Sequence, residues 1–461
     1  MGRASMTEPL PDSTSLWIMS ARQLAITIRL GLCVVLVGLL AGVGSMCLAL
    51  LLHGVQHLTY GYDTGQWLGH ESFLQGVGLA SPWRRVEALA SAGLLAGVGW
   101  YAVYRWGRPL VSVRGAVAGK IMSPGSATTH ALLQILTVAM GSPLGREVAP
   151  REIGALFAQR IGIVFGVRAD QARVLIACGA GAGLAAIYNV PFAGALFVLE
   201  VLLAEMSASA AIQALVACAV ATWVARLGLG DEMQYHIPSY TVSNGLLAWS
   251  VLGGPILGAT AMAYRSLTAR MRARAPRGVL IIPYCLAAFC LTGILATVYP
   301  GLPGNGKGPL QSVLIDGMTL KVAAIMLLLK LIVTAACLRA GAQGGLLTPG
   351  LTVGGLLSLV LALGLRLIGV DLDAGACACV GAAAFLGVSM QMPLTALMLM
   401  LGFTGMSPDF LLPIMMASCG AWLAANWIKQ TQGDLGAVTF QGSRGGRMEQ
   451  GSKVGADKPP V

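Results

Sequence analysis

The sequence predicts an all-α polytopic membrane protein made of two inverted-topology repeats of broken and tilted helices. Three observations lead to this fold class. The 461-residue chain is 56% hydrophobic and only 11% charged, and its mean hydropathy is +0.75, a composition that excludes an ordinary soluble protein. Several apolar segments are interrupted by Gly or Pro and are too short to cross about 30 Å of hydrocarbon, which predicts half-helices that meet inside the bilayer. Finally, a pattern of glycine and proline recurs in the second half of the chain.

The charge and cysteine patterns exclude several classes of function. The net charge is +11, with 30 Lys and Arg against 19 Asp and Glu, but the basic residues lie mainly in short loops between apolar segments, where they act as topology signals. We therefore expect the lipid bilayer as a partner, and no nucleic acid. The ten cysteines are scattered through apolar segments and the five histidines form no ligand cluster, so we expect neither a metal site nor a cofactor.

Basic segments predict the topology and the domain limits. Residues 1–22 are polar and are expected to form a disordered cytoplasmic N-terminus, and the first apolar span begins near Ile26. The segments 105–120 and 265–277 are strongly basic and should also be cytoplasmic by the positive-inside rule. We expect a multi-pass protein of the plasma (inner) membrane. Its parts are a first transmembrane repeat, a second transmembrane repeat and a polar C-terminal tail, over residues 23–228, 229–432 and 433–461 respectively.

The segment from Gly141 to Gly154 places four charged residues in a very apolar chain. Its glycines and Pro150 predict a loop that runs into a helix N-terminus. Such an end offers free amides and the positive end of the helix dipole, so it can hold an anion within the membrane, and Glu147 stands beside it. The local sequence fits a structural helix start equally well, with Glu152 as a favourable charge in the first turn, paired with the neighbouring arginines.

An internal repeat favours the anion site. Gly141, Gly145 and Gly154 align with glycines 200 residues later, and the Asn189-Val-Pro191 break aligns with Gln391-Met-Pro393, 202 residues later. The loop at 301–309 is expected outside and the loop around Ser112 inside, so the two halves should be inverted relative to each other. Two helix N-termini, at Glu147 and at Leu347, would then point into one cavity at the bilayer midplane from opposite sides.

Four ordered motifs resemble the CLC family of chloride channels and chloride/proton exchangers, and in particular its bacterial members without cytoplasmic CBS domains. Gly145-Arg146-Glu147 with Ile153-Gly154 resembles the Gly-Arg-Glu-Gly-Pro signature, and Gly344-Gly-Leu-Leu-Thr-Pro349 resembles Gly-Gly-Ile-Phe-Ala-Pro. The segment 179–200 and Met392-Pro-Leu-Thr-Ala396 are similar to the blocks that follow these two motifs. The resemblance covers nearly the whole membrane region in the right order.

The resemblance implies a homodimer in which each subunit carries its own pathway for chloride or a similar small anion. Carried over by position, Glu147 would be the gating glutamate. Ser112 is the candidate for the serine of the family's Gly-Ser-Gly-Ile-Pro motif, although only the serine matches. The residues expected to bind the anion are Ser112, Gly145, Arg146, Val148, Gly345, Leu346 and Leu347.

The chain departs from the exchangers of this family at two places. Val201 aligns with their inner proton-accepting glutamate, and their pore tyrosine aligns near Asp434. The resemblance therefore favours passive, channel-like conduction. Alternatives are a chloride/proton antiporter that uses another inner route, for which Glu205 is a candidate, and a fluoride-selective relative. An intramembrane enzyme with Glu147 and Glu152 as an acid/base pair is disfavoured, because carboxylates five residues apart diverge on a helix.

Three weaker signals point to structural roles. His130 lies in an apolar helix and is expected to be hydrogen bonded there, with a proton site as the alternative. Lys330, within a span, and Arg339, near its end, are expected to pair internally or to extend toward the interface. The segment from Gly301 to Lys307 resembles a phosphate-binding loop, but Gly308 replaces the required Ser or Thr.

Overall fold

The computed structural model of the chain describes residues 13–61 and 73–445, and the side chains of residues 24–61 and 73–431. The first half contains α1 (Ser13–Tyr60), α2 (Phe73–Leu79), α3 (Pro82–Trp106), α4 (Val113–Val117), α5 (Pro124–Ala139), α6 (Val148–Val164), α7 (Ala169–Tyr188), α8 (Pro191–Phe197), the π-helical turn η1 (Val198–Leu203) and α9 (Ala208–Leu229). The second half contains α10 (Asn244–Ala273), α11 (Ile281–Val298), α12 (Lys307–Leu314), α13 (Leu320–Ala340), α14 (Leu347–Arg366), α15 (Ala374–Met390), α16 (Pro393–Thr404), the 3-10 turn η2 (Pro408–Phe410) and α17 (Leu411–Gly445).

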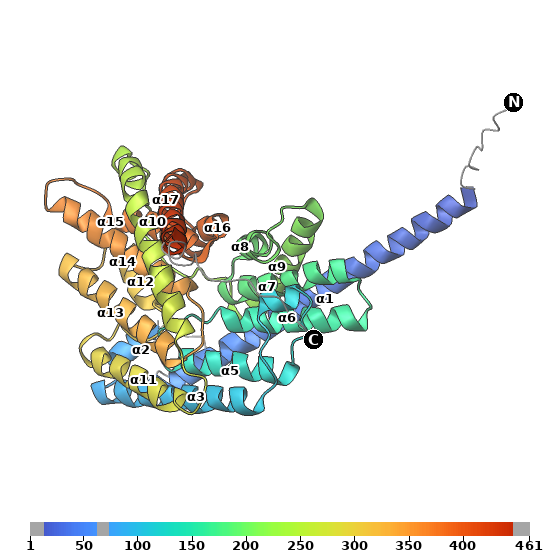
Figure 1. Ribbon diagram of the computed structural model, residues 1–461, viewed down its shortest axis with the longest axis horizontal. Helices are drawn as coiled ribbons and strands as arrows, with labels where there is room; N and C mark the ends of the chain where they lie inside the picture. The colour runs from blue at the N-terminus through green and yellow to red at the C-terminus, as the bar shows by residue number, and fades with distance from the viewer. Residues whose placement is uncertain (1–12, 62–72, 446–461) are drawn as a thin grey trace, which may run out of the picture.

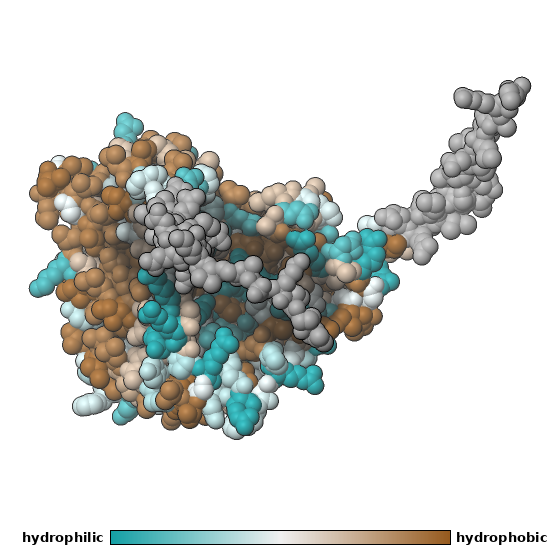
Figure 2. Space-filling model, viewed as in Figure 1, coloured by the Kyte–Doolittle hydropathy of each residue, from teal (hydrophilic) through white to brown (hydrophobic). Residues whose placement is uncertain are grey.

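Nine helices in the described part of the chain are long and apolar enough to cross a membrane. Large hydrophobic side chains on their outer faces are exposed, such as Leu252 at 73% and Trp427 at 67%, and hydrophobic residues cover much of the face shown in Figure 2. Exposing such a surface to water would cost much free energy, whereas exposing it to lipid is favourable. The predicted class of all-α polytopic membrane protein is confirmed.

The two breaks in the predicted repeat have the same backbone geometry in each half. Gly141 and Gly341 adopt left-handed conformations with φ of 109° and 101°, which favour glycine strongly. Asn189 and Gln391 end α7 and α15 with φ of 60° and 57°, and a proline then starts α8 and α16. Figure 1 shows these last two helices side by side near the middle of the molecule.

The relation between the halves is visible where they meet. Gly145 and Gly345, which occupy equivalent positions, form an isolated antiparallel bridge. Gly145 N donates to Gly345 O at 2.7 Å, and Gly345 N donates to Gly145 O at 2.9 Å. A reciprocal pair of equivalent residues running in opposite directions is what a two-fold axis between the halves produces. The inverted repeat expected from the sequence is therefore present.

Small residues allow the central helices to approach each other closely. Helix α7 is rich in Gly and Ala, and its C-terminal two thirds are buried. A Cβ atom added at Gly154 on α6 would overlap the carbonyl oxygen of Gly179 on α7, and one added at Gly183 would overlap the carbonyl of Pro150. These contacts fix the position of the first turn of α6, from which Glu147 projects.

Three buried or stacked basic residues have internal partners. Lys330 is 1% exposed, and its Nζ donates to the carbonyls of Leu302 at 2.7 Å and Gly304 at 2.8 Å. Arg85 donates to three carbonyls, those of Val77, Gly78 and Ala296. Arg339 lies over the ring of Tyr284 at 5.3 Å from its centroid. The expected internal pairing of Lys330 and Arg339 is confirmed, and Lys330 fixes the loop that leads into α12.

The chain ends differ in part from the sequence expectations. Helix α1 begins at Ser13, so residues 13–22 are helical rather than irregular, and residues 1–12 lie outside the described residues. Helix α17 continues to Gly445, so the expected tail begins with helix, and residues 446–461 lie outside the described part. The limit expected between the repeats, at residues 228 and 229, coincides with the end of α9.

Candidate functional site

Glu147 lies where the two halves of the molecule meet. It is the N-cap residue of α6, but its side chain makes no capping bond to that helix. Instead, its Oε1 accepts a hydrogen bond of 2.9 Å from the amide of Leu347, the equivalent residue of the second half and the first residue of α14. The side chain is 0% exposed. A carboxylate thus occupies a free helix N-terminus, which is a place that suits an anion.

Gly145 and Gly345 make room for this carboxylate. A Cβ atom added at either glycine would overlap the carboxylate of Glu147. Their amides, however, are already bonded to each other's carbonyls. That Gly145 and Gly345 bind the anion stays a prediction: in this conformation their amides hold the halves together, and the amide that bonds to the Glu147 carboxylate is that of Leu347.

The two arginines beside Glu147 point away from its carboxylate. Arg146 donates through a terminal nitrogen to Gln234 Oε1 at 3.3 Å, and its guanidinium lies 5.4 Å from the centroid of the Tyr188 ring. Arg151 donates to the backbone carbonyl of Glu147 at 2.9 Å and lies over Phe197. Among the described residues no ion pair is formed with Glu147. Partial charges therefore surround the site, and a fully charged partner, which would trap an anion, is not in contact with it.

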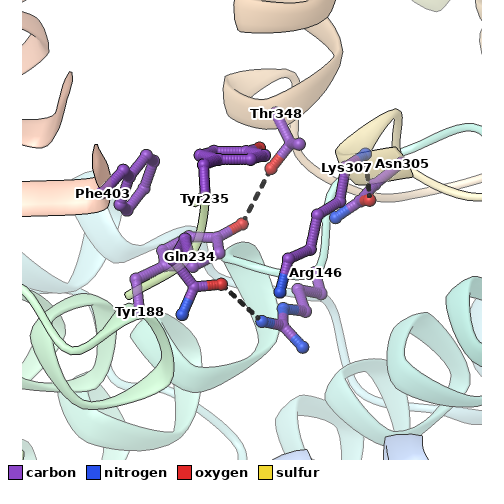
Figure 3. Close-up of a pocket in the computed structure, with 8 residues that line it drawn as sticks. All are labelled: Arg146, Tyr188, Gln234, Tyr235, Asn305, Lys307, Thr348 and Phe403. Atoms are coloured by element: carbon purple, nitrogen blue, oxygen red, sulfur yellow. Dashed lines mark hydrogen bonds between the residues drawn. The ribbon is translucent and has the colours of Figure 1, made fainter. Parts of the chain in front are cut away.

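A small cavity lies next to this site. Its lining contains two basic side chains, Arg146 and Lys307, and no acidic one, and the Nε of Arg146 is buried without a hydrogen-bond partner. Figure 3 shows both cations directed toward the same space. The lining comprises Arg146, Tyr188, Gln234, Tyr235, Asn305, Lys307, Thr348 and Phe403. Asn305 belongs to the loop at 301–309 that the sequence predicts on the outer side, and the two cations make the lining positively charged.

Two residues of the site were missed by the sequence interpretation. The hydroxyl of Tyr188 donates to Glu147 Oε2 at 3.2 Å and lies 3.0 Å from the hydroxyl of Thr348. Tyr188 immediately precedes the Asn189 break, and Thr348 follows Leu347. Their positions next to motif residues could have indicated that they belong to the site. The sequence does not show, however, that the two hydroxyls contact each other.

Glu152 has a different environment from the one expected. It is not in the first turn of α6, and its Oε2 lies 2.9 Å from His130 Nδ1 and 3.1 Å from Gln134 Nε2, both on α5. The expected pairing of Glu152 with Arg146 and Arg151 is therefore wrong. The hydrogen-bonded role expected for His130 is confirmed. Since Glu147 and Glu152 have separate partners on different helices, they do not form an acid/base pair.

Ser112 is the N-cap residue of α4, and its Oγ accepts from the amide of Gly115 at 3.2 Å. It therefore lies at a helix N-terminus, as an anion-binding serine would, but its side chain is exposed and turned to its own helix. Its contact with a transported anion stays a prediction. Val148 begins α6, and Leu346 is the N-cap residue of α14.

The inner acid expected from the family pattern is absent at Val201. This residue lies in η1, half-buried. The neighbouring Glu200 caps the N-terminus of α16: its carboxylate accepts from the amides of Leu394 at 3.0 Å and Thr395 at 2.8 Å, and from the Thr395 hydroxyl at 2.6 Å. Glu205 is exposed beyond the end of η1. Asp434 lies in α17, where its side chain is outside the described set.

Glu200 accepts hydrogen bonds from two amides that have no partner within α16. Removing its carboxylate should therefore destabilise the fold. We expect Glu200→Ala to lower the free energy of unfolding by about 1–3 kcal/mol. Thermal unfolding of the purified protein in detergent measures this change. Glu205→Ala, which removes an exposed carboxylate five residues later, is the control and should leave the unfolding temperature unchanged. Equal destabilisation by the two variants would contradict the capping role.

Comparison with known proteins identifies the family of this chain. The model of the voltage gated chloride channel family matches residues 92–426. The voltage-gated ClC-type chloride channel ClcB of Citrobacter koseri is 28% identical over 363 residues, which cover 73% of this chain and 84% of that protein. The ClcB protein of Salmonella dublin is 28% identical over 408 residues, which cover 83% of this chain and 93% of that protein.

Solved structures have the same fold. A slow cyanobacterial Cl⁻/H⁺ antiporter superposes with a TM-score of 0.75 at 19% identity, covering 87% of this chain and 95% of the other. A CLC-type fluoride/proton antiporter superposes with a TM-score of 0.61 at 20% identity, covering 87% and 96%. The family match spans more than half of the sequence and includes the Glu147 site and its counterpart at Leu347. The chain therefore belongs to the CLC family of voltage-gated chloride channels and related anion transporters.

Proposed function

We propose that this chain conducts chloride, or a similar small anion, passively through a pore at the interface of its two repeats, with Glu147 as the gate. The observation that carries the proposal is the bond from the Leu347 amide to the Glu147 carboxylate. A carboxylate that accepts a hydrogen bond from a free amide at a helix end occupies a site where a permeating anion would bind. As long as the carboxylate is ionised, it competes with that anion.

The site has the balance of charge that conduction needs. Moving an anion from water into a low-dielectric interior costs many kcal/mol, and direct contact with a full positive charge would hold the anion too strongly. A helix-end amide offsets part of this cost and still permits release. Arg146 and Lys307 lie in the cavity beside the gate, where they attract anions toward the entrance. Protonation of Glu147 removes the competing charge, so acid should open the pathway.

The named relatives support chloride as the transported ion, since they are called ClC-type chloride channels, whereas two of the similar solved structures are proton antiporters. Val201 in place of an inner acid, and Glu200 engaged at the start of α16, favour passive conduction over antiport. By resemblance to the family we also propose a homodimer in the plasma (inner) membrane, with a cytoplasmic N-terminus.

A liposome assay with an internal pH-sensitive dye distinguishes passive conduction from exchange. An outward chloride gradient is imposed across vesicles that contain the purified protein, and no uphill proton movement is expected. Chloride efflux should instead require a shunt for the membrane potential, such as valinomycin with potassium, because passive chloride movement is electrogenic. Uphill proton movement driven by chloride would show antiport. Repeating the assay with fluoride in place of chloride tests the fluoride-selective alternative.

A further inference from the structure

Two hydroxyl groups from different halves of the molecule meet at the Glu147 carboxylate. Tyr188 is the last residue of α7, and Thr348 lies in the first turn of α14. The Tyr188 hydroxyl is 3.2 Å from Glu147 Oε2 and 3.0 Å from Thr348 Oγ1. The same two residues line the charged cavity (Figure 3). The pair therefore lies between the Glu147 carboxylate and the charged cavity.

The Tyr188 ring is held firmly in place. It is 4% exposed and packs edge-on against Phe403, with ring centroids 5.2 Å apart. The Arg146 guanidinium lies over the same ring at 5.4 Å, a cation–π contact that is favourable in such a buried setting. A fixed ring gives its hydroxyl one position, so the hydrogen bond to Glu147 is preorganised and loses little entropy when it forms.

The donors and acceptors of Glu147, Tyr188 and Thr348 determine which group donates each hydrogen bond. An ionised carboxylate only accepts hydrogen bonds, whereas each hydroxyl can donate one and accept others. When Glu147 is ionised, Tyr188 must donate to it, and Thr348 can then donate to Tyr188. When Glu147 is protonated, it can donate to the Tyr188 oxygen, and Tyr188 can donate to Thr348. The charged state gains the stronger bond, because a hydrogen bond to an ionised group is roughly twice as strong as a neutral one.

We propose that Tyr188, supported by Thr348, is a positioning residue that latches the Glu147 gate shut and sets the pH at which it opens. This inference rests on the proposed gating role of Glu147. Other charged or titratable groups lie near the carboxylate without an ion pair to it, in the loop before α6, on α6 and on α10: Arg146, Arg151, Arg272 and Tyr264. Arg151 and Arg272 bond to the backbone carbonyls of Glu147 and Gly344, so they stay in place when the Tyr188 hydroxyl is removed.

The variant Tyr188→Phe tests the latch, because it removes one oxygen and keeps the ring. Chloride flux from liposomes is measured across a series of symmetric pH values. Without the hydroxyl the ionised gate is less stable, so protonation and opening occur at higher pH. We expect the pH of half-maximal flux to rise by about one unit. Thr348→Val should shift it in the same direction by less, since it removes only the support for Tyr188.

Tyr235→Phe is the matched control. Tyr235 is also buried, lines the same cavity and packs against Phe403, with ring centroids 5.9 Å apart, but no hydrogen bond described in the structure joins its hydroxyl to Glu147. Its removal should leave the half-maximal pH unchanged. The half-maximal pH does not depend on how much folded protein is reconstituted, so a loss of stability in either variant does not obscure the result.

The outcomes separate the latch from the gate. An unchanged half-maximal pH in Tyr188→Phe, or an equal shift in Tyr235→Phe, would overturn the latch. Glu147→Gln is measured in parallel. If its flux keeps the full pH dependence, the gating role itself fails. If its pH dependence is lost while Tyr188→Phe behaves as wild type, only the latch fails.

Discussion

Glu147→Gln is expected to leave chloride flux high at neutral pH and to abolish its pH dependence. The Glu147 carboxylate accepts a hydrogen bond of 2.9 Å from the Leu347 amide. Glutamine has the shape of the protonated acid and cannot become an anion, so it cannot compete with a permeating anion as a negative charge at this amide. Wild-type flux should fall as the pH rises, by up to about tenfold per unit, because ionised Glu147 competes with the anion. Efflux from liposomes at symmetric pH, with valinomycin as the potential shunt, measures both profiles.

Glu152→Gln is the control for this variant. It makes the same chemical change five residues later on α6, at a carboxylate bonded to His130 and Gln134 rather than to the second half of the molecule. Its flux should keep the wild-type pH dependence. If flux through Glu147→Gln followed pH as the wild type does, or if Glu152→Gln alone lost the response, the assignment of Glu147 as the gate would be wrong.

Gly154→Ala is expected to have the largest effect on stability. An added methyl group at Gly154 would overlap the backbone carbonyl of Gly179, and backbone cannot swing away as a flexible side chain can. The two helices must separate, and overpacking of this kind costs about 1–3 kcal/mol or more. Because α6 carries Glu147 at its start, the displacement should also reduce chloride flux. Thermal unfolding in detergent and liposome flux measure the two effects.

Gly162→Ala, on the same helix, provides the comparison. An added Cβ there meets Ala172 and Leu175 at 3.9 Å, which is ordinary contact. Because alanine favours helix over glycine by about 1 kcal/mol, this variant should be neutral or slightly more stable. If Gly154→Ala were as stable as Gly162→Ala, close packing of α6 on α7 would not be what requires glycine at residue 154.

The arrangement of charge around Glu147 is compatible with the proposed anion pathway although arginines lie close to it. Arg146 and Arg151 flank Glu147 in the sequence, yet Arg146 is directed to Gln234 and the Tyr188 ring, and Arg151 to a backbone carbonyl and Phe197. Under the proposed function, their charge would attract anions without a direct contact that holds them. Lys330 contributes in another way, since it fixes the carbonyls of the loop before α12.

The sequence was sufficient for the fold class, the repeat and the gate candidate. Hydropathy predicts membrane helices because unpaired backbone groups are not tolerated in lipid. The recurring glycines and prolines predict the breaks because left-handed turns and helix starts require those residues locally, as at Gly141, Gly341, Pro191 and Pro393. Glu147 stood out because a carboxylate within an apolar span needs a functional or structural reason.

Other features were beyond the sequence because they depend on partners distant in the chain. The sequence predicts Gly145 and Gly345 near the anion, but it does not show that their amides bond to each other's carbonyls across 200 residues. Glu152 looked like a first-turn charge, but it pairs with His130 on a neighbouring helix. Glu200 showed no role in the sequence beside Val201, but it caps α16 through the amide of Leu394, which lies 194 residues later in the chain. In each case a polar group inside the protein bonds to whichever partner the packing brings within hydrogen-bonding distance.

Hydropathy and backbone conformation are local properties of residue type, so the sequence alone predicts a membrane-embedded inverted repeat with a glutamate at a helix start. What that glutamate contacts is visible only in the folded protein: the Leu347 amide and the Tyr188 hydroxyl, with the charged cavity next to them. Those contacts follow from how closely small residues let α6, α7 and α14 approach, and hydrogen bonds form or fail over distances of less than an ångström.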